Sequence, residues 1–272
     1  IYTTHMGSNE PDYDADNPIV RGSQSVVETE YLTDALTREA VDFIDRHDDK
    51  PFFLYLAYNA VHSPLQGADA YMKKFAHIED IHRRIFAAML SNMDDSVGAV
   101  MAQLRKSGLE ENTLVFFLSD NGGCAEFLAE DGERPQPFRY QIPTRDGRRI
   151  RVGNTPSIDP GPDDTFASYD LPWANASNTP FRLYKHWVHE GGIATPFIMH
   201  VPEAYRTTAM PSIIHEPCHV IDVMPTVLEL AGATHPAEVS HGAVQPLEGA
   251  SLLPPASGGS LNRGTPIYWE HE

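Results

Sequence analysis

The stretch from Thr113 to Gly123 constrains the fold of this chain more than any other. Residues 113–118 are rich in β-branched and aromatic types, which predicts a buried strand. The strand leads directly into Ser119, Asp120 and Asn121, followed by two glycines. Ligands of open α/β sheets bind where strands reach their carboxyl edge, and Asp and Asn oxygens are ligands that hard cations such as Ca2+ or Mg2+ prefer. Taken alone, however, the same residues are those of an ordinary turn.

A second apolar run, residues 51–58, is typical of a strand buried on both faces of a parallel sheet. Apolar residues at helical spacing predict a helix from about residue 79 to Lys106 between the two runs. Another helix is predicted from Ser25, which fits a capping box with Glu28, to about residue 46. The alternation of helix and strand predicts an α/β fold in which helices flank a central, mostly parallel sheet.

The second half of the chain is less regular. Residues 124–177 alternate prolines, glycines and charged residues, which predicts a long loop insertion at the active-site edge of the sheet. Residues 194–201 are predicted to form another core strand. Residues 222–232 are predicted to form a helix closed by its terminal glycine. Residues 266–269 are predicted to begin a final strand.

Composition excludes several classes of function. The net charge of −18 argues against nucleic-acid binding, which needs clustered Lys and Arg. No apolar run approaches the ~18 residues of a membrane span. Cys124 and Cys218 are too few and too far apart for a disulfide framework or a CxxC metal site. The oligomeric state is left open.

Polar side chains with catalytic potential follow the predicted strands or lie between them. They are His62, Asp120, Asn121 and Lys185. Each has an ordinary explanation when taken singly, as a surface or structural residue. Together they provide two metal-type oxygens, a cation and an imidazole, which could hold a tetrahedral oxyanion beside a divalent ion.

Four segments together resemble the sulfatase family of the alkaline-phosphatase superfamily, and bacterial arylsulfatase-like enzymes most. They are residues 51–64, 112–123, 184–196 and 221–226. The resemblance runs from about residue 25 to the end. It implies an alkaline-phosphatase-like fold, with residues 1–272 forming a partial sulfatase catalytic domain. Residues 266–272 would then begin a C-terminal subdomain.

The resemblance also implies roles for the candidate residues. Asp120 and Asn121 would be metal ligands of one Ca2+, and Lys185 would bind the sulfate oxygens. His62 would lie beside the sulfate as a proton donor or hydrogen-bond partner, so that His62 and Lys185 are both catalytic and substrate-binding. The reaction implied is hydrolysis of an aryl or carbohydrate sulfate, on a sulfated small molecule or glycan. Bacterial relatives are often exported, which suggests a periplasmic or extracellular location.

The family pattern is incomplete in this chain. Sulfatases of this kind use a formylglycine made from Cys or Ser in a C/S-x-P/A-S-R motif, and neither Cys124 nor Cys218 fits it. The amino-terminal metal carboxylates are also missing. We expect both upstream of Ile1, which makes the chain an internal or C-terminal fragment that is inactive alone and binds Ca2+ poorly. Two alternatives stay open: a phosphatase or phosphodiesterase of the same superfamily, and a non-catalytic glycan-binding relative.

Four arginines lie close together within the long loop, at positions 145, 148, 149 and 151. One hypothesis places them at the pocket rim, against a sulfated or uronic-acid-containing glycan. The other, which we prefer, makes them an exposed basic turn that balances an acidic surface.

Overall fold

The computed structural model describes residues 19–126, 128, 143–144, 146–208, 210–239 and 242–271. The chain divides into two compact units. The first contains the chain up to Leu109 and the segment Asn121–Ala194, and the second contains Glu110–Asp120 and the chain from Thr195 onward. Within the described residues, no helix has the length and apolar character needed to cross a membrane.

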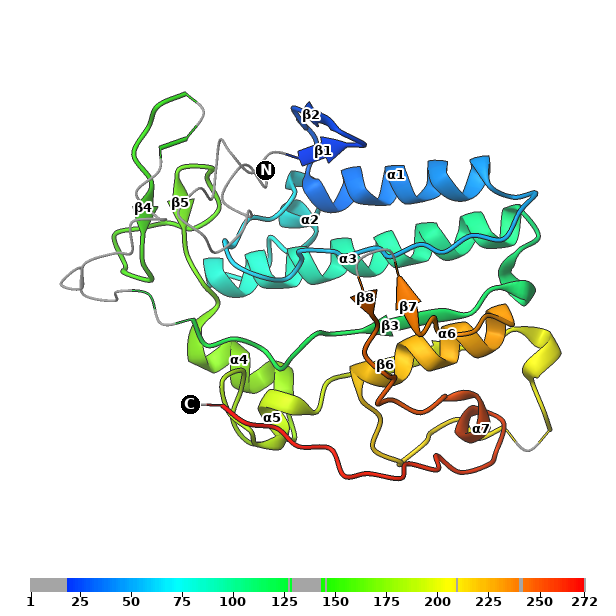
Figure 1. The fold of residues 1–272 in the computed structure, drawn as a ribbon. Coiled ribbons are helices and arrows are strands. Elements are labelled where there is room, and N and C mark those ends of the chain that lie inside the picture. The colour runs from blue at the N-terminus through cyan, green and yellow to red at the C-terminus, as the bar shows by residue number, and fades with distance from the viewer. Residues whose placement is uncertain are drawn as a thin grey trace. The chain divides into compact units, whose positions relative to one another are not determined.

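Two long helices form the centre of the first unit. Helix α1 (Leu32–Arg46) and helix α3 (Ile81–Lys106) lie side by side (Figure 1). Their apolar stripes are buried, with Ile44, Ile85 and Met89 each no more than 1% exposed. Asp80 caps α3 by accepting a hydrogen bond of 2.8 Å from the N–H of Arg83. The predicted helix over residues 79–106 is therefore confirmed.

Helix α1 begins later than the sequence predicts. Residues 24–26 form strand β2 (Gln24–Val26), which pairs antiparallel with β1 (Ile19–Arg21). The predicted capping role of Ser25 is wrong because this residue belongs to the hairpin. The carboxylate of Glu28 instead accepts hydrogen bonds from the N–H groups of Thr29 and Glu30 and from Arg38.

The remaining elements of the first unit are short. They are α2 (Asp69–Lys74), β4 (Arg151–Val152), β5 (Thr165–Phe166), α4 (Asp170–Asn178) and α5 (Glu190–Ile193). Strands β4 and β5 pair in parallel. The predicted loop over residues 124–177 is irregular over much of its described length, but its last part is helix α4, which the proline-rich pattern concealed.

The second unit is organised around a strand pair and one helix. Strand β3 (Val115–Leu118) pairs antiparallel with β6 (Phe197–His200), Val115 facing His200. Helix α6 (Val223–Ala231) ends at Gly232 in the left-handed region, as predicted. The other elements are η2 (Glu110–Asn112), η4 (Glu203–Tyr205), η5 (Val220–Asp222), β7 (Glu238–Val239), β8 (Gly242–Ala243) and α7 (Leu253–Ala256). Strands β7 and β8 pair antiparallel.

Two predicted strands do not form. Residues 51–58 belong to no sheet among the described residues, and their side chains alternate between exposed and partly buried. Phe53 is 70% exposed and Tyr55 82% exposed. Residues 266–269 are also outside any strand. The predicted central, mostly parallel sheet is absent from the described residues, whose strands pair in twos, with β4 and β5 the only parallel pair among them.

Candidate functional site

The four predicted site residues come from three segments of the chain and are divided between the two units. His62, Asn121 and Lys185 belong to the first unit, and Asp120 ends the Glu110–Asp120 segment of the second. Asp120 and Asn121 are adjacent in the chain at the end of β3. Among the described residues, no hydrogen bond or ion pair joins the side chains of His62, Asn121 and Lys185. Backbone contacts link the segments of Asn121 and Lys185 instead.

The glycine turn after Asn121 packs directly against the segment that follows Lys185. The N–H of Gly122 donates to the carbonyl oxygen of Gly192 at 3.0 Å. A Cβ atom on Gly122 would lie only 1.8 Å from the carbonyl oxygen of Gly191. The two backbones therefore approach more closely than any side chain allows, which explains the glycines on both sides.

Asn178, at the end of α4, ties the same two segments together. Its Oδ1 accepts a hydrogen bond of 2.9 Å from the N–H of Gly123, and its Nδ2 donates to the carbonyl of Leu183 at 3.0 Å. The N–H of Lys185 then donates to the carbonyl of Gly123 at 2.9 Å. Sequence reasoning missed Asn178, since an Asn before Thr-Pro reads as an ordinary helix end.

The backbone on each side of Lys185 is strained. Leu183 has φ of 68° and His186 has φ of 84°, in a region that side chains other than glycine seldom adopt. Such conformations persist only where the surrounding structure enforces them, and they concentrate at functional sites. The contacts of Asn178 and of the glycine turn supply that enforcement here.

His62 is exposed and oriented by its neighbour. Its Nδ1 lies 2.8 Å from the carbonyl oxygen of Ser63. Because a carbonyl only accepts, Nδ1 carries the proton of this bond, which leaves Nε2 of the neutral ring as the acceptor. The following residues are buried, and the N–H of Leu65 donates to the carbonyl of Ala167 at 3.0 Å. His62 is thus attached to a fixed segment with Nε2 available for proton transfer.

Asp120 and Asn121 offer the type of oxygen ligand that Ca2+ binds, but too few of them for a complete site. Asp120 is exposed, and Asn121 donates its Nδ2 hydrogen to the carbonyl of Gly122 at 2.9 Å. The Oδ1 of Asn121 is therefore the atom left to face a cation. No group of three His, Cys, Asp or Glu side chains suited to a metal occurs in the described part of the chain. Ca2+ takes 6–8 oxygens, so these two residues alone do not make a complete Ca2+ site.

Cys124 follows the glycine turn directly. Its thiol is half-buried, and burial raises its pKa, although the nearby charge of Lys185 acts in the opposite direction. Its backbone N–H donates to the hydroxyl of Tyr169 at 2.7 Å. A thiol with a raised pKa stays protonated near neutral pH, which makes Cys124 a poor nucleophile.

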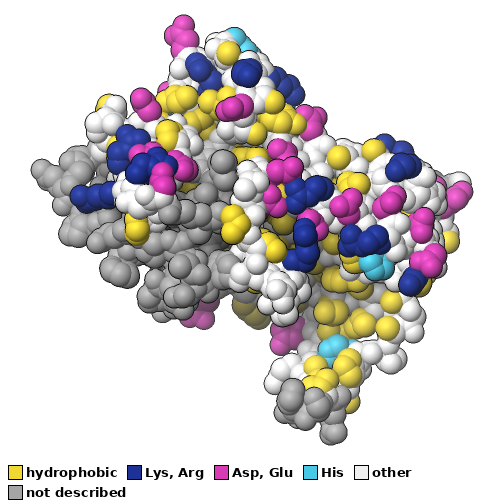
Figure 2. All heavy atoms as spheres, turned by 90° about the horizontal axis from the view of Figure 1, so that it is seen from above, with side chains coloured by type: hydrophobic (Ala, Val, Ile, Leu, Met, Phe, Trp, Pro, Cys, Tyr) yellow, Lys and Arg dark blue, Asp and Glu magenta, His cyan; other side chains and the backbone are white. Residues whose placement is uncertain are grey.

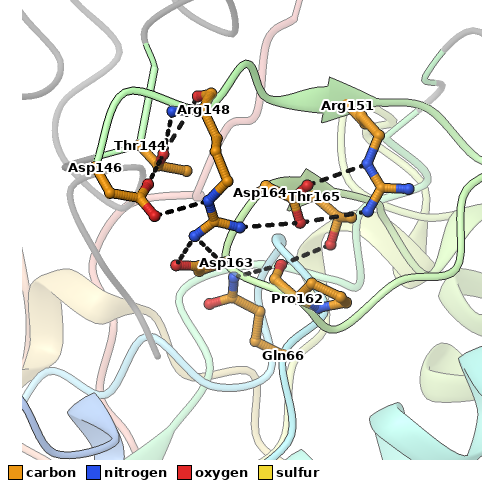
Figure 3. A network of polar contacts seen from close by, with 9 residues as sticks. All are labelled: Gln66, Thr144, Asp146, Arg148, Arg151, Pro162, Asp163, Asp164 and Thr165. Carbon is orange, nitrogen blue, oxygen red and sulfur yellow. Dashed lines mark hydrogen bonds and ion pairs between the residues drawn. The ribbon is translucent and has the colours of Figure 1, made fainter.

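The arginines of the long loop are largely engaged within the chain. Arg148 lies between Asp146 and Asp163, and Arg151 contacts Asp164 (Figure 3). The nitrogen-to-oxygen distances are 2.8 Å for both pairs of Arg148 and 3.3 Å for Arg151 with Asp164. Arg149 is exposed, and Arg145 lies outside the described residues. Lys, Arg, Asp and Glu side chains are interspersed over the face drawn in Figure 2. These pairs favour the balanced surface turn over a substrate rim.

Comparisons with known proteins identify relatives along most of the chain. It is 29% identical over 202 residues to arylsulfatase J of Mus musculus, covering 74% of this chain and 25% of that protein. It is 27% identical over 271 residues to an arylsulfatase of Klebsiella aerogenes, covering 82% and 55%. The chain thus spans between a quarter and about half of these relatives.

A solved structure shares the fold. The crystal structure of Ps i-CgsB in complex with k-i-k-neocarrahexaose matches with a TM-score of 0.57 and 31% identity, covering 81% of this chain and 38% of that one. The model of the family described as Sulfatase matches residues 2–233. The chain therefore belongs to the Sulfatase family, as its sequence motifs predicted.

Proposed function

We propose that this chain carries the downstream metal-binding and sulfate-binding part of a Ca2+-dependent sulfatase that hydrolyses sulfate esters. The observation that carries the proposal is the hydrogen bond between the backbones of Lys185 and Gly123, which holds a cationic residue beside the turn that starts with Asn121. A positive group next to metal-type oxygens suits an anionic ester bound beside a divalent ion. Membership of the Sulfatase family supports the same reading.

Each residue has a defined role in this proposal. The ammonium of Lys185 would pair with the non-bridging oxygens of the sulfate and stabilise the charge that they carry. In its protonated form, His62 would give the proton on Nε2 to the oxygen that leaves as the ester bond breaks, while Nδ1 keeps its bond to the carbonyl of Ser63. Asp120 and Asn121 would contribute oxygens to Ca2+, which supplies further positive charge at the sulfate when it is bound.

The substrate proposed is a sulfated aryl compound or carbohydrate. Two of the relatives are arylsulfatases, and the matching crystal structure holds an oligosaccharide, neocarrahexaose. A phosphate monoester carries more negative charge than a sulfate monoester, and the phosphatases of the superfamily use more metal ligands. The affinities of the chain for sulfate and for phosphate therefore distinguish a sulfatase from a phosphatase.

The site requires groups that this chain does not supply. Cys124 lies outside any formylglycine motif, burial raises the pKa of its thiol, and two oxygens do not complete a Ca2+ site. We propose that the formylglycine and the remaining ligands come from residues outside these 272. The same residues would supply strands on either side of residues 51–58 and so complete the central sheet.

The test uses the 272-residue chain and measures anion binding by calorimetry in the presence of millimolar Ca2+. We expect weak sulfate binding that is lost in Lys185→Met and retained in Lys106→Met, an exposed lysine of the same unit. We also expect no turnover of 4-nitrophenyl sulfate. Equal loss in both variants, or phosphate binding more tightly than sulfate, contradicts the proposal.

A further inference from the structure

We propose that Asn178 is a positioning residue that sets the anion affinity of the site by holding Lys185 against the glycine turn. The identity of the anion rests on the proposed sulfatase function, whereas the positioning rests on geometry alone. Asn178 lies at the end of α4. It joins the turn and the lysine segment through its side-chain amide.

Both ends of the amide are used. Asn178 is 9% exposed, its side-chain oxygen accepts from the N–H of Gly123, and its side-chain nitrogen donates to the carbonyl of Leu183. Asn178 accepts one of these hydrogen bonds and donates the other. A side chain that only donates or only accepts can therefore form one of them at most. Truncation leaves a partly buried N–H and a partly buried carbonyl unpaired, which costs more than the two bonds contribute.

The bond to Leu183 does the positioning. Leu183 adopts φ of 68°, an unfavourable conformation that must be held by its surroundings. Nδ2 of Asn178 fixes the carbonyl of this residue, and the chain then turns so that Lys185, two residues later, donates to Gly123. Without the amide nitrogen, Leu183 is free to relax to negative φ, and the relaxation carries Lys185 away from the turn.

Gly123 is therefore held through both of its peptide groups. Its N–H is bound by Asn178 and its carbonyl is bound by Lys185. Asn121 lies two residues earlier on the same turn, and its side chain is bonded to the intervening Gly122. A cation at Asn121 and an anion at Lys185 act on one fixed turn, so their binding is expected to be reciprocally coupled through it.

Three substitutions separate this role from a purely structural one. Asn178→Ala removes both bonds. Asn178→Asp keeps an acceptor for Gly123 but loses the donor to Leu183. Asn175→Ala is the matched control, since this residue is an exposed Asn of the same helix whose side chain makes no hydrogen bond in the described structure.

The experiment combines hydrogen exchange with a sulfate titration, at a temperature where each variant is fully folded by circular dichroism. We expect the Lys185 amide to exchange at least tenfold faster in Asn178→Ala and Asn178→Asp than in Asn175→Ala. Sulfate affinity, measured with inorganic sulfate and Ca2+, is expected to fall about tenfold in the same two variants. Of the two Asn178 variants, only Asn178→Asp should keep the protection of the Gly123 amide, because it keeps an acceptor oxygen.

The outcomes discriminate between the two proposals. Unchanged exchange at Lys185 in Asn178→Ala overturns the positioning role, whatever the sulfate result. Faster exchange with unchanged sulfate affinity also overturns it, because the turn then does not set affinity. If the Asn178 variants exchange faster at Lys185 but the parent chain binds no sulfate, the result supports the holding of Lys185 against the turn. The same result contradicts the proposed sulfatase function.

Discussion

The N–H of Lys185 donates to the carbonyl oxygen of Gly123 at 2.9 Å, which joins two segments that are 62 residues apart in sequence (185 minus 123). The contact depends on glycines, because the backbones that surround it are too close for side chains. It places the candidate anion-binding residue on the turn that carries Asn121. The stability of this junction is the first property that mutation can test.

Gly122→Ala is expected to destabilise the first unit. The new Cβ would lie 1.8 Å from the carbonyl oxygen of Gly191, and backbone atoms on both sides would have to move. Overpacking of this kind costs about 1–3 kcal/mol of the free energy of unfolding. Urea denaturation followed by circular dichroism measures the loss.

The control for that substitution is Gly98→Ala in the middle of α3. A Cβ there meets nothing within 4 Å, and alanine favours the helix by about 0.5–1 kcal/mol. The two glycine-to-alanine changes should therefore shift stability in opposite directions. A Gly122→Ala variant as stable as the parent chain would mean that the glycine turn is not packed as described.

Local signals in the sequence predicted the elements that they control. Apolar spacing predicted α3, Gly232 ends α6 as predicted, and the apolar run before Asp120 contains strand β3. These features depend on a few neighbouring residues, so a pattern of types and spacings is enough. The adjacency of Lys185 to Gly123 was not predictable in this way, because nothing local links residues so distant in sequence.

The failures have equally physical causes. Ser25 satisfies the capping-box pattern, yet strand pairing with Val20 takes its backbone into a hairpin. Asn178 carries no distinctive motif, and its importance arises only from two partners in other segments. Residues 51–58 have the composition of an inner strand, but a strand needs neighbours, and the described residues provide none.

Asp222→Ala is expected to be strongly destabilising. The carboxylate is completely buried, accepts hydrogen bonds from the N–H groups of His219 and Ala250, and pairs with Arg263. Removing one partner of a buried ion pair costs about 3–5 kcal/mol because the other charge stays buried. Thermal unfolding of the second unit measures the effect.

A surface pair provides the comparison for Asp222. Glu39→Ala breaks the contact with Arg21, whose side chain is 66% exposed. Exposed pairs contribute about 0–1 kcal/mol, so this variant should unfold close to the parent chain. Similar losses in the two variants would argue that Asp222 is not the buried centre of the hydrogen-bond network around η5.

Glu28 should contribute to the acid sensitivity of the first unit. Hydrogen bonds from the Glu30 N–H and from Arg38 lower its pKa from 4.5 to about 2. A carboxylate with a lowered folded-state pKa stabilises the fold above the unfolded value, and this stabilisation is lost as pH falls from about 4.5 toward 2. Glu28→Gln should flatten the dependence of stability on pH over that window. Glu79→Gln, which removes the same charge at an exposed residue before α3, is the control for loss of a carboxylate.

The exposed side of residues 51–58 should make the purified chain self-associate. Phe53 is 70% exposed and Tyr55 82% exposed on an extended segment without a ladder partner, and such edges pair with other chains. Phe53→Lys combined with Tyr55→Lys should shift the chain toward monomer in sedimentation velocity. Val27→Lys, at a 74% exposed residue of the same unit, serves as the control for added charge. If Val27→Lys shifts the chain toward monomer equally well, net charge governs the self-association and the unpaired segment 51–58 does not. If only the double variant does so, residues 51–58 are the strand edge at which further strands of the sheet would pair.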